Sequence, residues 1–222
     1  MLWWARGREL RQQEQGRQHS HGVRRLDTAR RKMGAGIGDT CAMPHVIERA
    51  SSGRAKCRAC GGKIASGDLR FGERLPNPFS EEGGEMTHWF HLWCAAYRRP
   101  ETLLLTVNAE GAALPEDLSD LEAMKQEAQL GVAHHRVPRV NVAERASTGR
   151  AVCRACKQPI TKDAWRISLL YYEDGRFQPS GFVHVACART YFETDAIMPR
   201  LKHFSPALTE TDVKEIEAAL ST

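Results

Sequence analysis

The sequence predicts two small α+β modules, each nucleated by zinc, and three observations support this prediction. The spacing Cys57-x2-Cys60-x30-His91-x2-Cys94 recurs as Cys153-x2-Cys156-x27-His184-x2-Cys187. Residues 48–60 and 144–156 are identical at 11 of 13 positions, with a constant offset of 96 residues. Each ligand set is also followed by an acidic stretch with helical periodicity. We therefore expect two copies of a short antiparallel sheet plus helix, each followed by an acidic amphipathic helix.

Each recurring set supplies three thiolates and one imidazole, which form a closed tetrahedral shell for Zn²⁺. A catalytic zinc usually keeps one coordination position open, so both sites are expected to be structural. The odd total of seven cysteines argues against a disulfide framework, and the downstream His-x2-Cys argues against a redox Cys-x2-Cys. Cys41 is left without a role. We expect two zinc ions per chain, with the ligands Cys57, Cys60, His91, Cys94, Cys153, Cys156, His184 and Cys187.

The domain organisation follows from composition. Residues 1–43 are rich in Arg, Gln and Gly and are expected to be a disordered or misassigned N-terminal extension, with an organelle transit peptide as the alternative. Residues 44–100 form the first zinc finger, and residues 101–139 an acidic helix and linker. Residues 140–204 form the second zinc finger, and residues 205–222 a C-terminal acidic helix. Because each finger is small, we expect zinc to supply the stability that a large core would otherwise give.

Individual elements can be predicted from local patterns. Residues 68–72 and 164–171 have strand-like composition, and residues 86–97 should begin as a strand and end as a short helix. Leu114, Leu118 and Leu121 are helically spaced, with Pro115 near the start and Gly131 beyond the end, so a helix is predicted over 114–130. Residues 209–220 are predicted to form a second acidic amphipathic helix.

The net charge of +5 hides a segregation of sign along the chain. Residues 44–100 carry nine Lys/Arg against six Asp/Glu, and residues 140–204 carry ten against six. Residues 101–139 carry three against seven, and residues 205–222 carry one against four. Both fingers are therefore basic and the stretches after them acidic, which suits two anion-binding patches on a nearly neutral body. No apolar run is long enough to span a membrane.

These motifs resemble the PARP-type zinc finger, which is found in tandem in DNA-break-sensing poly(ADP-ribose) polymerases and singly in a DNA ligase. The resemblance covers about residues 44–222. It includes the Ser/Thr-Gly-Arg-Ala-x-Cys lead-in at 52–57 and 148–153, His-Trp-Phe-His at 88–91, and Leu-Lys-His-Phe-Ser at 201–205. The second gap of 27 residues is slightly short for the family.

The resemblance implies a finger that recognises the structure of DNA and not its sequence. Arginines would grip phosphates, and an apolar pair in the variable loop would stack on bases exposed at a break. The phosphate candidates are Arg54, Arg70, Arg150 and Arg166, although pairing with Glu48 or Glu144 would make some of them braces of the fold. The stacking candidates are Phe79 and Met86 in the first finger, with Leu75 as a competitor, and Tyr172 and Phe177 in the second.

We therefore expect zinc-dependent DNA binding that recognises strand breaks or DNA ends. The expected partners are nicks, ends and the duplex backbone, with no membrane or small-molecule substrate and with any partner enzyme left open. The chain is expected to be intracellular and DNA-associated, in a nucleus or in a bacterial nucleoid. A zinc-stabilised protein-interaction adaptor is the alternative, and no catalytic constellation indicates an enzyme. His91 is preferred over His88 as a zinc ligand, and His45, His134, His135 and His203 are expected to be surface residues without partners.

Overall fold

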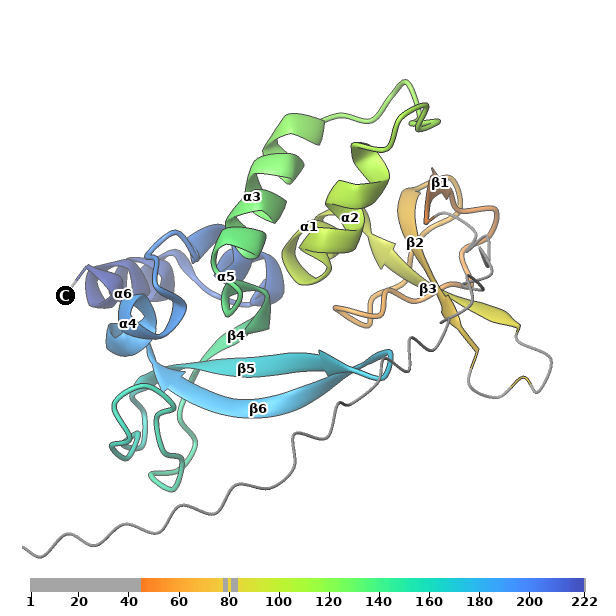
Figure 1. The fold of residues 1–222 in the computed structure, drawn as a ribbon. Helices are drawn as coiled ribbons and strands as arrows, with labels where there is room; N and C mark the ends of the chain where they lie inside the picture. Colours follow the sequence, from red (N-terminus) through yellow and green to blue (C-terminus); the bar gives the residue numbers. More distant parts are fainter. Residues whose placement is uncertain (1–44, 78–79, 81–83, 222) are drawn as a thin grey trace, which may run out of the picture. The chain divides into compact units, whose positions relative to one another are not determined.

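The computed structural model of the chain describes residues 45–77, 80 and 84–221. The expectations for residues 1–43, Cys41 and Phe79 therefore lie outside the described residues. Two three-stranded antiparallel sheets and a set of short helices make up the described chain (Figure 1). We call residues 45–133 the first module and residues 137–221 the second module. The predicted small α+β modules, each with a short antiparallel sheet and helices, are confirmed.

The first sheet has the order β1-β2-β3, with β1 at Val46–Arg49, β2 at Leu69–Pro76 and β3 at Glu85–His91. Gly72 in the central strand lies opposite Val46 on one side and Trp89 on the other. A Cβ atom at Gly72 would come within 2.6 Å of the Trp89 ring and 2.9 Å of the Val46 side chain. Glycine at this position therefore allows the indole to pack across the middle of the sheet.

Three helices follow this sheet: α1 at Leu92–Arg98, α2 at Pro100–Val107 and α3 at Leu121–Ala133. Helix α3 packs against α1 and α2. The predicted helix over 114–130 is wrong at its start, because residues 114–120 form turns and irregular backbone and Asp120 has a left-handed φ of 58°. The first core nevertheless includes contacts from all three leucines, Leu114, Leu118 and Leu121. The spacing of these apolar residues therefore predicted correctly which side chains pack against the core, but not where the helix begins.

The second sheet has the order β4-β5-β6. Its strands are Val140–Arg145, Trp165–Glu173 and Arg176–His184, preceded by a 3₁₀ turn, η1, at Val137–Arg139. A second 3₁₀ turn, η2 at Val185–Cys187, leads into three helices: α4 at Ala188–Phe192, α5 at Met198–Phe204 and α6 at Glu210–Leu220. The strand expected at 164–171 and the helix expected at 209–220 are both confirmed.

Each module has its own apolar core, but the first core also includes side chains from the second module. Phe71 and Phe90 are fully buried at the centre of the first core, and Phe204 of α5 is buried in the same cluster. Phe177 of β6 packs against this cluster as well. The two modules are therefore joined by apolar contacts as well as by the chain. None of the described helices combines the length and apolar character needed to cross a membrane.

Candidate metal centres and nucleic-acid interface

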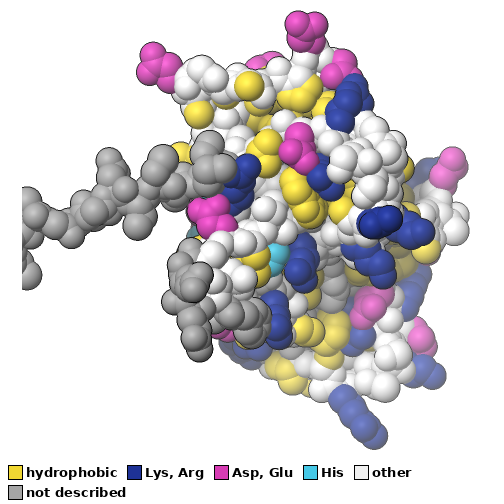
Figure 2. Space-filling view, turned by 90° about the vertical axis from the view of Figure 1, so that its right-hand side faces the viewer, with side chains coloured by type: hydrophobic (Ala, Val, Ile, Leu, Met, Phe, Trp, Pro, Cys, Tyr) yellow, Lys and Arg dark blue, Asp and Glu magenta, His cyan; other side chains and the backbone are white. Residues whose placement is uncertain are grey.

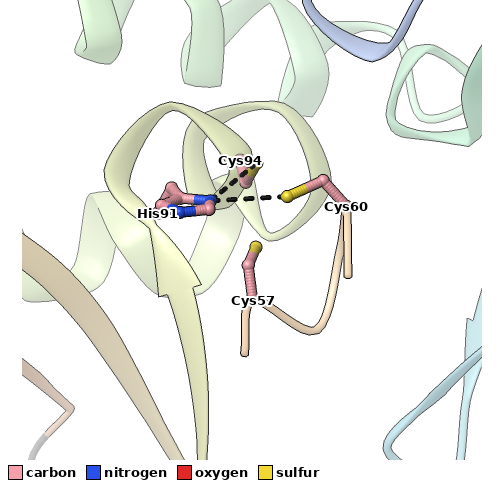
Figure 3. A group of neighbouring side chains, drawn as sticks. All are labelled: Cys57, Cys60, His91 and Cys94. Atoms are coloured by element: carbon pink, nitrogen blue, oxygen red, sulfur yellow. Dashed lines mark hydrogen bonds between the residues drawn. The ribbon is translucent and has the colours of Figure 1, made fainter. Parts of the chain in front are cut away.

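The first candidate metal centre is built from a tight turn and a strand–helix junction. Cys57 and Cys60 lie on the turn, which the hydrogen bonds Cys57 N–H to Gly62 O and Gly61 N–H to Cys57 O close at 2.8 Å each. His91 ends β3, and Cys94 lies in the first turn of α1. The side chains of Cys57, Cys60, His91 and Cys94 point toward one another (Figure 3). We call residues 54–62 the first knuckle and residues 150–158 the second knuckle.

The donor atoms have the separations that a tetrahedral zinc site requires. The four donor atoms of each set all lie within 4.8 Å of one another. His91 Nδ1 is 3.4 Å from Cys60 Sγ and 3.8 Å from Cys94 Sγ, and His184 Nδ1 has the same distances to Cys156 and Cys187. With Zn–S bonds of about 2.3 Å and Zn–N bonds of about 2.0 Å, donors at the corners of a tetrahedron lie roughly 3.5–3.8 Å apart.

Backbone carbonyls fix which imidazole nitrogen faces the thiols. His91 Nε2 lies 3.1 Å from the carbonyl oxygen of Lys63, and His184 Nε2 lies 3.3 Å from that of Pro159. An N–H at Nε2 donates to each carbonyl, which leaves the lone pair of Nδ1 free for the metal. The equivalent hydrogen bond in both copies sets the tautomer of each ligand histidine.

The electrostatics of the thiols also favour a bound cation. The hydrogen bond to Cys57 and burial raise the pKa of the Cys94 thiol far above its usual value. Burial and the neighbouring thiols raise the pKa of Cys187 to about 12. Three crowded thiols cannot all be ionised without a compensating positive charge, and a divalent metal supplies it. Geometry and donor set therefore fit two structural zinc ions, one held by each Cys₃His set.

Two histidines that were expected to lack partners have partners in the structure. His203 Nε2 lies 3.1 Å from Cys94 Sγ, and His45 Nδ1 accepts a hydrogen bond from the Arg74 backbone N–H at 3.2 Å. No signal in the sequence connects His203 with Cys94, which is 109 residues away. His88 is buried and lies 3.2 Å from the Tyr172 hydroxyl, and His91, not His88, lies with the three cysteines of the first ligand set.

The four arginine candidates divide into two kinds. Arg70 and Arg166 are buried, and each makes two hydrogen bonds with one carboxylate oxygen, that of Glu48 and Glu144 respectively. The Arg70 guanidinium also stacks on Trp89 at 3.5 Å. Arg54 and Arg150, in contrast, are exposed, and neither side chain forms an ion pair with another described residue. Of the four candidates, Arg70 and Arg166 therefore pair with Glu48 and Glu144, and Arg54 and Arg150 do not.

Further cations on the knuckles were missed by the sequence reasoning. Lys56 and Arg58 flank Cys57, and with Arg54, Thr87 and Trp89 they line a hollow of about 510 Å³. Arg154 is the counterpart of Arg58 in the second knuckle. Its guanidinium lies over Gly181, where a Cβ atom would come within 2.9 Å of Arg154 Nε. The signal that could have found these cations is the Lys/Val-Cys-Arg triplet inside the repeated 13 residues.

Basic side chains are spread over this part of the surface. Figure 2 shows the side of the molecule on which β1–β3 lie, with several Lys and Arg side chains on the visible face and Asp and Glu among them. The ion pairs of the described residues use seven arginines, including Arg99 with Glu73 and Arg200 with Glu127. The knuckle cations belong to none of these pairs, so their charge remains available for an external anion.

The stacking candidates have different surroundings. Met86 is half-buried and, with Arg58 and His88, lines a hollow of about 350 Å³ beside the β5–β6 turn. Tyr172 and Phe177 lie on the first module: Arg99 stacks on the Tyr172 ring at 3.9 Å, and Phe177 meets Phe90 edge-on at 6.4 Å. A base-stacking pair in the second finger would project freely into solvent. Neither aromatic ring of this hairpin does so, because both pack on the first module. Leu75, the competitor in the first finger, is half-buried.

Comparisons with known proteins match the part of the chain that carries the first metal site. Residues 48–135 match the model of the poly(ADP-ribose) polymerase and DNA-ligase Zn-finger region. The chain is 30% identical over 143 residues to a poly(ADP-ribose) polymerase of Drosophila melanogaster and 27% identical over 146 residues to poly(ADP-ribose) polymerase 1 of Gallus gallus. These alignments cover 59% and 60% of this chain and 14% of each relative.

A relative with a different name matches over a similar length. The chain is 24% identical over 177 residues to the polynucleotide 3'-phosphatase ZDP of Arabidopsis thaliana, which is 65% of this chain and 24% of that protein. The chain thus spans less than a quarter of the length of each relative named here. The family match and the two Cys₃His centres lead to one conclusion: residues 48–135 are similar to a PARP-type zinc-finger region, and the two ligand sets of the chain hold two zinc ions.

Proposed function

We propose that the protein binds DNA through its zinc knuckles and prefers strand breaks or ends over intact duplex. The observation that carries this proposal is the group of unpaired cations on the first knuckle. Arg54, Lys56 and Arg58 surround one hollow beside the aromatic ring of Trp89, and none of them pairs with a described carboxylate. Arginine forks fit phosphate oxygens, and the zinc-fixed turn holds them in place.

The second knuckle supplies a related group. Arg150 and Arg154 are exposed there, while Val152 replaces Lys56 and is also exposed. We infer that phosphate contacts come from both knuckles and that Arg70 and Arg166 act as buried braces under them. Buried arginines that already bind a carboxylate have few donors left for phosphate.

A preference for breaks requires an apolar contact in addition to the phosphate contacts, because every duplex presents the same backbone. Met86 is the described candidate that lies next to the knuckle cations, since it shares a hollow with Arg58. Tyr172 and Phe177 could stack on a base only after the β5–β6 hairpin leaves the first module. The name of the Arabidopsis relative, a polynucleotide 3'-phosphatase, supports polynucleotide ends as the target class. The role assigned here is one of binding, without a catalytic step.

The test compares closed circular, nicked and blunt-ended DNA of matched length and sequence at several salt concentrations. We expect tighter binding to nicked or ended DNA. Arg54→Ala and Arg150→Ala should weaken binding to all forms and lower the salt slope by about one each. Lys214→Ala is the matched control, because this exposed lysine lies on the acidic helix α6. Equal affinity for closed and nicked circles would refute break recognition, and salt-independent or absent DNA binding would favour the protein-interaction adaptor.

Met86→Ala separates the two possible sources of break preference. If the first-finger loop provides the stacking contact, this substitution should reduce the preference for nicked DNA and leave binding to closed circles unchanged. Phe177→Ala should instead change stability, because its ring packs against the first core. A loss of break preference in Phe177→Ala at unchanged stability would assign base stacking to the second hairpin.

A further inference from the structure

The two zinc centres differ in what surrounds their last cysteine ligand. At the first centre, His203 Nε2 of the second module lies 3.1 Å from Cys94 Sγ. At the second centre, the hydrogen-bond partners of Cys187 Sγ among the described residues are its fellow ligands alone. Cys94 is buried, whereas Cys187 is partly exposed. The repeated ligand pattern therefore conceals an asymmetry that comes from the contact between the modules.

The position of His203 is fixed by packing on one face of α1. This face carries Cys94, Tyr97 and Arg98, at the i, i+3 and i+4 positions. The His203 ring meets Tyr97 edge-on at 5.0 Å and Phe204 at 4.8 Å. Phe204 is itself buried in the first core. Two aromatic neighbours thus direct the imidazole toward the thiolate, and the helix that carries His203, α5, packs on β4 of the second module.

Arg98 adds a positive charge to the same side of the centre. Its side chain is 2% exposed, donates to the Pro138 carbonyl at 3.0 Å and to Asn141 Oδ1 at 2.8 Å, and has no carboxylate partner among the described residues. The guanidinium stacks on Phe204 at 4.0 Å. A centre of three thiolates, one neutral imidazole and Zn²⁺ carries a net charge of about −1, which a buried guanidinium nearby compensates.

We propose that the second module completes the outer shell of the first zinc centre, with His203 as the residue that positions and protects the Cys94 thiolate. An N–H donor on a zinc-bound thiolate lowers its basicity and so slows its protonation and release. The edge of the imidazole beside the sulfur also occupies space through which a reagent would approach Cys94. The first zinc should consequently be held more firmly than the second, although the two ligand sets are identical.

The experiment is pulsed alkylation of the full-length zinc-loaded protein in excess chelator, with peptide mapping to follow each cysteine. Cys60 and Cys156 are the matched reporters, because both are exposed members of equivalent pairs. In the unsubstituted protein, Cys60 should be labelled more slowly than Cys156. His203→Phe keeps the ring contacts and removes the N–H, so labelling of Cys60 and Cys94 should become faster by about 10-fold or more, with Cys156 and Cys187 unchanged.

Two further variants make the outcome decisive. His203→Gln retains an N–H donor and should restore slow labelling at least in part, whereas His135→Phe makes the same change at an exposed histidine outside the ligand sets and should have no effect. Unchanged labelling of the first centre in His203→Phe would overturn the proposal. So would equal acceleration at both centres, since that indicates general unfolding, or a His203→Gln variant as labile as His203→Phe.

Discussion

At the scale of single residues, the arginines of one repeat copy have different surroundings and different expected roles. Arg54 and Arg70 both come from the first copy, but Arg54 is exposed on the knuckle while Arg70 is 7% exposed under Trp89. The difference comes from the strand: β2 places Arg70 opposite Glu48 of β1, where the two side chains meet across the sheet. Arg166 and Glu144 repeat this arrangement in the second sheet. From the sequence, the pairing of these arginines with Glu48 and Glu144 was one of two alternatives. The sequence could not decide between them, because the pairing depends on the register of the strands.

The two kinds of arginine should respond differently to truncation. Arg70→Ala removes hydrogen bonds to a carboxylate and a stacking contact, so it should lower the free energy of unfolding by about 1–3 kcal/mol. Glu48 stays partly exposed, which keeps the loss below that of a fully buried unpaired charge. Arg54→Ala removes no described contact and should change stability by at most about 0.5 kcal/mol. Urea unfolding of both variants measures the difference, and equal losses would contradict the assignment of Arg70 as a brace.

At the scale of elements, the sequence predicted strands and the C-terminal helix better than the helices of residues 92–133. The helix of 210–220 begins where its signal lies, because Thr209 and Asp212 form a capping box. Helix α2 was not predicted, because the three consecutive apolar residues Leu103-Leu104-Leu105 show no helical spacing of apolar and polar positions. Pro100 in its first turn was a helix-start signal that went unused. The register of the sheets and the hydrogen bond between Cys94 and His203 depend on tertiary contacts and could not be read from local pattern.

The capping box makes a testable contribution to α6. Thr209 accepts a hydrogen bond from the Asp212 N–H, and the Asp212 carboxylate accepts one from the Thr209 N–H at 2.9 Å. Thr209→Ala should lower the free energy of unfolding by about 1 kcal/mol, because an orphan backbone donor loses its partner. Thermal or urea unfolding followed by circular dichroism provides the measurement. Thr211→Ala, one residue inside the helix, is the control and should be close to neutral.

The β5–β6 turn is a second element whose sequence dictates its shape. Asp174 and Gly175 have φ values of 49° and 74°, the left-handed pair that a two-residue hairpin turn needs. A Cβ atom at Gly175 would also come within 2.8 Å of the His88 ring in the first module. Gly175→Ala should therefore cost about 1–2 kcal/mol from the backbone alone, and disturb the contact with His88 in addition.

A matched glycine controls for the effect of adding a methyl group. Gly149→Ala has a nearest neighbour at 3.8 Å and no positive φ, so its free energy of unfolding should be close to that of the unsubstituted protein. Amide hydrogen exchange at residues 170–179 should rise in Gly175→Ala and stay unchanged in Gly149→Ala. Equal exchange in the two variants would show that the turn does not hold the hairpin on the first module.

At the scale of the molecule, the described modules are joined by polar contacts as well as by the apolar contacts of the first core. Glu73 is fully buried, pairs with Arg99 at 2.5 Å, and lies 3.4 Å from the Tyr172 hydroxyl of the other module. Burial raises the pKa of Tyr172 to about 12, so its hydroxyl remains protonated and can donate to Glu73 at neutral pH. Two modules that each fold around their own zinc would not need such contacts. We therefore expect the two zinc-nucleated modules to unfold as coupled units.

This coupling leads to a prediction about loss of one metal ligand. Cys60→Ala should abolish the first zinc centre and lower the zinc content from two per chain to one. The α1 helix should then lose its anchor at Cys94, and the side chains of Arg98 and Arg99 should no longer hold the second module. Hydrogen exchange should consequently increase in the β5–β6 hairpin near Tyr172 and Phe177, as well as throughout the first module. The strand β4 and the helix α6, which pack within the second core, should keep their protection.

The reciprocal variant, Cys156→Ala, distinguishes coupling from simple proximity. It removes the second centre, and hydrogen exchange should rise first around the second knuckle and β6, where His184 is anchored. The first zinc should become easier to extract only if α5 shifts and His203 leaves Cys94. If Cys60→Ala leaves exchange of the hairpin unchanged, the modules fold independently and their interface contributes little. If exchange rises there while α6 stays protected, the hairpin is the element through which the first zinc stabilises the second module.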